Sequence, residues 1–114
     1  MKNYEDMSDS QIAQKVFFFV SSDLCPKGGL AHISSDGFFF FDDKNIKQKF
    51  DPCNNPADAW PIIANNFISI IPSIHRDIWF TDGQGGETTF HANPLRAAMI
   101  VFLKMNEVNY DPVD

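Results

Sequence analysis

Cysteine, basic residues and long apolar segments are all scarce in this chain of 114 residues. Its two cysteines, Cys25 and Cys53, form no CxxC pair and are too few for a disulfide framework. The longest apolar run, Ala97 to Leu103, is far too short to cross a bilayer. The polar N-terminus leads into no segment of signal-peptide form. We therefore expect a cytoplasmic protein with free thiols and no membrane contact.

The charge balance is acidic. Nine basic residues face fifteen acidic ones, which gives a net charge of −6 and an isoelectric point near 4.8. The largest basic cluster, Lys44, Lys47 and Lys49, directly follows Asp42 and Asp43. Because this balance repels a phosphate backbone, we expect no direct binding of nucleic acid. A basic protein surface is a compatible partner.

What the chain does contain is typical of one globular domain. Its length matches a common domain size, and 44% hydrophobic against 21% charged residues suits a folded core. No internal repeat and no Gly/Ser or Pro-rich linker divides it. Twelve phenylalanines indicate a well-filled core and leave room for an apolar interface. We predict a single domain over residues 1–114.

Two segments carry clear helix signals. A helix over residues 8–20 would have Ser8 as its N-cap and Asp9 as an acid in its first turn, with Ile12 and Val16 on one apolar face. A helix over residues 94–106 is apolar almost all round at its centre, so it should be largely buried.

A further helix is predicted over residues 56–65, with Asn55 as its N-cap and a proline at its first position. Pro61 would remove a hydrogen bond and crowd the preceding turn. We therefore expect either a short first turn that ends near Trp60 or a restart of the helix capped by Asp58.

Strand signals predict a hairpin over residues 30–41, with Asp36 and Gly37 as the central residues of a type I′ turn. Within it, the consecutive phenylalanines 38–41 would face both sides of their strand, so helices should cover both sides. Further strands are predicted over 67–71, 77–82 and, shorter, 88–91. This order predicts the α+β class, with an antiparallel or mixed sheet of four to five strands and helices on both faces, an α/β/α sandwich.

Three stretches resemble one known family, the NinX-like proteins of lambdoid phages and prophages. The family's central motif is similar to Phe50–Ile63 (FDPCNNPADAWPII) followed by Ile68–Ile70. Its C-terminal motif resembles Asn93–Leu103, and its N-terminus resembles Tyr4–Ile12, whereas residues 20–49 match nothing that can be placed. The resemblance implies a phage- or prophage-encoded accessory protein and, from related phage proteins, an α/β/α sandwich. It implies no established activity.

Arg96 is the foremost candidate for a functional residue. With Asn93 as N-cap, it lies in the first turn of the last helix, where the helix dipole disfavours a cation by about 0.3–1 kcal/mol. One interpretation is an anion site built from Arg96 and the free N–H groups of the helix start. The interpretation that we prefer is structural: an ion pair with a carboxylate such as Asp58, or simple solvation.

Four residues at the start of the 56–65 helix complete the candidate binding set: Asn54, Asn55, Asp58 and Trp60. Asp58 lies three residues after Asn55, close to a capping box, which explains it without a function. Trp60 is either an exposed anchor for a partner or, as we expect, a core residue.

Signals for metal or nucleophilic chemistry are weak. His32, His75, His91, Cys25 and Cys53 could supply zinc ligands, but their spacing matches no ligand pattern. A nucleophilic set could be drawn from Cys53, a histidine and an aspartate, but nothing places them together. We therefore expect no metal and no cofactor, and we lean against an enzyme.

The favoured function is binding of a host or phage protein. A variant is an acidic decoy that competes for a nucleic-acid-binding protein, with clustered surface carboxylates and binding that salt weakens. The alternative is a small-molecule or anion-binding protein, or an enzyme, with a pocket at Arg96 and the Asn54–Asp58 helix start.

Overall fold

The computed structural model describes residues 3–74 and 77–107, so His75 lies outside the described residues. The elements follow one another as a short 3-10 helix and then helices and strands in mixed order: η1 (Tyr4–Asp6), α1 (Asp9–Leu24), β1 (Ala31–Ser34), β2 (Gly37–Phe41), β3 (Lys47–Lys49), α2 (Pro56–Asn65), β4 (Ser69–Pro72), β5 (Trp79–Asp82), β6 (Thr88–His91) and α3 (Pro94–Glu107). No helix among these is long and apolar enough to cross a membrane.

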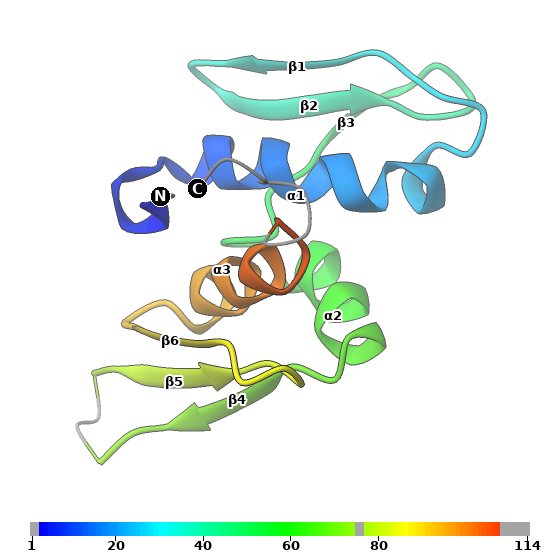
Figure 1. The fold of residues 1–114 in the computed structure, drawn as a ribbon. Coiled ribbons are helices and arrows are strands. Elements are labelled where there is room, and N and C mark those ends of the chain that lie inside the picture. The colour runs from blue at the N-terminus through cyan, green and yellow to red at the C-terminus, as the bar shows by residue number, and fades with distance from the viewer. Residues whose placement is uncertain (1–2, 75–76, 108–114) are drawn as a thin grey trace.

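The helices occupy the middle of the molecule and the sheets lie on its outside (Figure 1). The described strands form two antiparallel sheets of three strands each: sheet A, in the order β1-β2-β3, and sheet B, in the order β4-β5-β6. Sheet A packs on α1, α1 packs on α3, and α3, with α2 beside it, packs on sheet B. The α+β class is confirmed. The predicted single sheet with helices on both faces is wrong.

The phenylalanines of β2 explain this error. Phe38 and Phe40 are buried, as expected for a face that packs on a helix. On the other face, His32 stacks on Phe39 with ring centroids 5.8 Å apart, and the Nζ of Lys47 lies 4.4 Å from the centre of the same ring. Because polar side chains of the neighbouring strands cover this face, no second helix layer is needed.

The β1–β2 hairpin turns one residue earlier than predicted. Ser34 pairs with Gly37, so Ser35 and Asp36 form the loop. Gly37 has a φ of 133°, a backbone conformation that residues other than glycine rarely adopt, whereas the φ of Asp36 is not positive. The predicted type I′ turn centred on Asp36 and Gly37 is therefore wrong.

Strand β3 was missed in the sequence, although its turn carries a recognisable signal. The Oδ1 of Asp42 accepts hydrogen bonds from the backbone N–H groups of Lys44 and Ile46, both at 2.9 Å. Asn45 adopts a φ of 61° in the same turn. Aspartate often accepts hydrogen bonds from the backbone of the next residues, and asparagine often adopts a positive φ. The sequence after Phe41 therefore does contain residues that favour a turn.

Helix α1 is one turn longer than predicted, and its start is as predicted. The Oγ of Ser8 accepts from the N–H of Gln11 (3.1 Å), and the Oε1 of Gln11 accepts from the N–H of Ser8 (2.8 Å). These reciprocal bonds form a capping box. Ile12 and Val16 are fully buried, as their spacing predicted.

Helix α2 continues through Pro61 without a break, so neither the short first turn nor the restart at Asp58 occurs. The proline leaves the carbonyl of Ala57 without its helical donor. Ala57 is exposed, so water can satisfy this carbonyl.

The end of α2 places an aromatic residue in an unusual conformation. The N–H of Ile68 donates to the carbonyl of Ile63 (3.1 Å), and that of Phe67 donates to the carbonyl of Ala64 (3.4 Å). This is a Schellman motif, whose left-handed position is usually glycine. Here Phe67 occupies it, with a φ of 53°.

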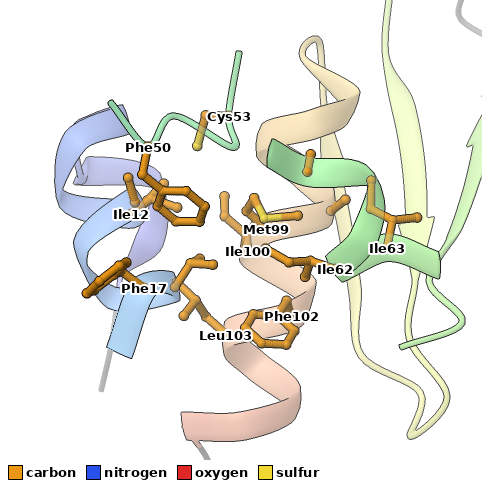
Figure 2. Packing of buried hydrophobic residues seen from close by; sticks show 14 of the residues in the cluster. Ile12, Phe17, Phe50, Cys53, Ile62, Ile63, Met99, Ile100, Phe102 and Leu103 are labelled. Atoms are coloured by element: carbon orange, nitrogen blue, oxygen red, sulfur yellow. The ribbon is translucent and has the colours of Figure 1, made fainter. Parts of the chain in front are cut away.

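Helix α3 forms the centre of the core, as its apolar sequence predicted. Every residue from Arg96 to Leu103 is buried. Figure 2 shows Ile12, Phe17 and Phe50 on one side of this helix and Ile62 and Ile63 of α2 on the other. The segment that follows β3 thus contributes the ring of Phe50 to the core, where it contacts Phe17 of α1 and Phe38 and Phe40 of β2.

Candidate functional site

Arg96 is buried, and the N-terminal segment surrounds its guanidinium group. Its Nη1 lies 2.6 Å from Oδ1 of Asp9. Its Nη2 donates to three backbone carbonyls, those of Tyr4 (3.1 Å), Glu5 (3.4 Å) and Met7 (2.8 Å). The expected ion pair with a carboxylate is present, but its partner is Asp9 and not Asp58. These contacts join the start of α3 to the start of α1, which favours the structural interpretation of Arg96.

Asp9 connects two residues of the predicted set. Its Oδ2 accepts a hydrogen bond from the Nδ2 of Asn54 at 2.9 Å, while its Oδ1 pairs with Arg96. Burial raises the pKa of the Asp9 carboxyl, but hydrogen bonds from Asn54 and Arg96 and the charge of Arg96 outweigh it, so the pKa lies below its ordinary value. Sequence reasoning used Asp9 only as a first-turn acid, and no spacing rule links residues 9, 54 and 96.

Cys53 lies beside this network and is fully buried. Burial, reinforced by the negative charge of Asp9, raises the pKa of its thiol well above the ordinary range. Since the thiolate is the nucleophilic form, this environment disfavours a catalytic role for Cys53.

Asn55 and Asp58 organise the start of α2. The Oδ1 of Asn55 accepts from the N–H of Ala57 at 3.0 Å, as expected for an N-cap. The Oδ2 of Asp58 accepts from the N–H of Asp51 (2.9 Å) and from the Nδ2 of Asn55 (3.3 Å). Asp58 therefore holds the preceding loop and does not bond to the N-cap backbone as in a capping box.

Trp60 is 64% exposed, so its predicted place in the core is wrong. The buried positions of α2 are Ala59, Ile62 and Ile63, and Trp60 lies off the face that they form. The exposed position fulfils the first requirement of the other interpretation, an anchor for a partner.

The described histidines and cysteines do not form a metal centre. Among residues 3–74 and 77–107, no group of three or more His, Cys, Asp and Glu side chains is placed to hold a metal ion. Both thiols are free and buried.

A cavity of about 630 Å³ lies among α1, α2 and α3. Asp58 lines it, whereas Asn54, Trp60 and Arg96 do not. Of the predicted set, the structure thus brings Asn54 and Arg96 together at Asp9, Asn55 and Asp58 together at the α2 start, and leaves Trp60 apart.

An apolar feature that the sequence analysis missed crosses the outer face of sheet B. The strand register aligns Ile71, Phe80 and Phe90, and we call these three residues the sheet B row. Ile71 is 46% and Phe90 61% exposed, and the rings of Phe80 and Phe90 lie 4.9 Å apart. α3 packs on the sheet's other face, where Thr81 and Thr89 are buried.

The chain was compared with models of protein families. A model described as "Bacteriophage P22, NinX" matches residues 3–106. It spans the stretches on which the resemblance rested and also residues 20–49, which carried none. No curated protein matches the chain.

Proposed function

The chain belongs to the family described as "Bacteriophage P22, NinX", and we propose that it is a phage accessory protein that acts by binding a protein partner. The observation that supports binding is the sheet B row. Aromatic side chains are enriched in the cores of protein interfaces, where a few of them supply most of the binding free energy.

The row is not needed to close the core. Sheet B already covers α3 with its inner face, and none of the described elements lies against its outer face (Figure 1). When a partner covers exposed apolar side chains, the free energy of binding becomes more favourable by about 25 cal/mol for each Å² of apolar surface buried. An aligned row on a sheet offers that area without a rearrangement of the backbone.

Phe67 supports the same proposal from the start of β4. Its left-handed backbone costs about 1–2 kcal/mol for a residue with a Cβ, and glycine would avoid this cost. Its ring is 71% exposed, so packing inside the chain compensates little of the cost. Strain of this kind is typical of functional positions. Trp60, on α2, is the second exposed ring that we assign to partner contact.

The experiment is a capture from bacterial host lysate with the tagged chain, its Ile71→Thr and Phe90→Thr variants, and a matched control. Ile33→Thr removes an isoleucine of similar exposure, 41%, from sheet A. Threonine keeps the strand preference in all three variants. We expect one stoichiometric partner that both row variants lose and that the control retains, with equal unfolding midpoints.

Retention of the partner by both row variants would overturn the proposal for this face, and Trp60→Ala would then test α2. Washes at low and high salt separate the two versions of the partner hypothesis. An acidic decoy loses its partner at high salt, because screening weakens charge pairing. A partner held by the row stays bound, since apolar burial is not screened.

A further inference from the structure

The cavity among the three helices carries a second inference, independent of sheet B. It lies between the C-terminal halves of α1 and α3 and the length of α2. We propose that it binds a small organic cation, with an ammonium or guanidinium group on an apolar body. Its volume of about 630 Å³ lies within the ordinary range of ligand pockets, about 300–1,000 Å³.

The walls of the cavity suit an apolar body. Phe19 and Phe102 form an edge-to-face pair with ring centroids 6.0 Å apart. Further aliphatic and aromatic residues line the cavity with them: Val20, Leu24, Phe50, Ala57, Pro61 and Ile62. The faces of aromatic rings also attract cations, so these walls serve both parts of the ligand.

The charged groups of the cavity have one sign. Asp23 and Asp58 line it, and none of its described lining residues is lysine, arginine or histidine. Asp58 uses its Oδ2 to hold the loop before α2, which leaves its Oδ1. Asp23 is exposed, and no hydrogen bond or ion pair joins its carboxylate to a described residue. A cation would therefore meet two carboxylates without displacing an existing ion pair.

The amides of the cavity add further acceptors. Asn66 and Asn106 each donate from Nδ2 to a backbone carbonyl one turn earlier, that of Ile62 at 2.7 Å and that of Phe102 at 2.8 Å. Only the NH₂ group can donate to a carbonyl, so these bonds fix which way each amide points. The side-chain oxygens remain as acceptors, and a ligand that donates hydrogen bonds fits them.

The charge of this ligand is opposite to that of the anion considered as an alternative in the sequence analysis. That alternative placed an anion at Arg96, whose guanidinium group already contacts Asp9 and three carbonyls. A pocket with carboxylates and no base repels anions and attracts amines.

The test compares two small probes that differ in charge and share an apolar body, 2-phenylethylamine and the neutral 2-phenylethanol. Each is titrated into the full ¹⁵N-labelled chain, and amide chemical shifts are followed. We expect saturable shifts around Asp23, Asn66 and Asn106 with the amine, and affinity for the alcohol about tenfold weaker, which corresponds to about 1.4 kcal/mol.

Matched variants locate the charge. Asp23→Asn should weaken the amine about threefold, because an exposed carboxylate contributes a modest amount. Asp43→Asn removes an exposed carboxylate that does not line the cavity and should leave the affinity unchanged. Equal affinities for amine and alcohol, equal effects of the two variants, or the absence of saturable shifts with the amine would each overturn the proposal. None of these substitutions touches the sheet B row, so this test and the capture experiment fail independently.

Discussion

Sheets A and B have three strands each but differ in whether phenylalanines are buried on the face that packs on a helix. In sheet A, Phe38 and Phe40 are buried on the side of α1. In sheet B, the side of α3 receives Thr81 and Thr89, and the rings of Phe80 and Phe90 point away from the helix. Phe38 and Phe40 of sheet A therefore stabilise the fold, whereas Phe80 and Phe90 of sheet B are left for the proposed partner.

The outer faces differ as well. Sheet A covers its outward ring, Phe39, with His32 and Lys47 from its own neighbouring strands. In sheet B no described polar side chain stacks on the row, and Phe90 stays 61% exposed. Proteins usually cover exposed apolar strands or place charged residues on them when no partner binds there. Polar side chains thus cover the outer face of sheet A, whereas the outer face of sheet B remains exposed.

The largest expected effect separates the two sets of phenylalanines. Phe50→Ala should cost about 3–5 kcal/mol of the free energy of unfolding, because its ring is buried among Phe17, Phe38 and Phe40. Phe90→Ala removes the same atoms from the row and should cost less than about 1 kcal/mol. Urea denaturation measures both, and Phe50→Leu replaces the first variant if it does not fold. Similar losses of stability at the two positions would contradict the distinction between a core phenylalanine and a surface phenylalanine.

The next largest effect concerns Arg96, which joins the start of α3 to the start of α1. Arg96→Met removes the donor of Asp9 and of three carbonyls and should cost about 2–4 kcal/mol, since it leaves a charge and buried acceptors unpaired. The matched control is a second ion pair between the described residues of α1 and α3, Lys15 with Glu107 at 3.4 Å. Lys15→Met should cost less than about 1 kcal/mol. Equal losses would show that Arg96 is not the structural link.

A smaller effect follows from the carboxylate of the same link. The pKa of Asp9 is lowered in the folded state, so its stabilisation is present above its unfolded pKa of about 3.9 and is lost as the pH falls through the folded value. Asp9→Asn should therefore cost about 1 kcal/mol at pH 7, and this difference should shrink at pH 3. Because Asp9 is partly exposed, solvent screening keeps the effect modest.

The background variant Arg96→Met provides the control for this pH dependence. Without the guanidinium group, the effect of Asp9→Asn on the free energy of unfolding should be smaller at pH 7 and should change less with pH. An effect of Asp9→Asn that grows at acidic pH in the wild-type background would contradict the sign of the shift.

Local signals in the sequence predicted the helices well. Ser8 with Gln11, Asn55 with Ala57, and the apolar run in α3 each act within a few residues, so a single sequence contains them. The errors concern contacts between distant segments. Nothing local specifies that β1–β3 and β4–β6 pair separately, or that the helices lie between the two sheets.

The candidate residues follow the same rule. Arg96 was identified by its unfavourable place at a helix start, but its partner Asp9 is 87 residues away in sequence. Trp60 was expected in the core because large rings usually are, and only the packed helix shows which face is outside. The sheet B row needs the register of three strands before its alignment exists.

The smallest effect has a sign that distinguishes strain from packing at the edge of sheet B. Phe67→Gly relieves a left-handed backbone worth about 1–2 kcal/mol and loses about 0.5–1 kcal/mol through the greater freedom of the unfolded chain. We expect a net gain of roughly 0.5 kcal/mol in the free energy of unfolding, together with weaker capture of the partner.

Phe18→Gly is the matched control, since its ring is 69% exposed against 71% for Phe67, and its backbone is helical. Glycine there should cost about 1 kcal/mol. If both substitutions destabilise the protein equally, the ring of Phe67 contributes to the fold, and the strain at this position no longer supports a role in binding.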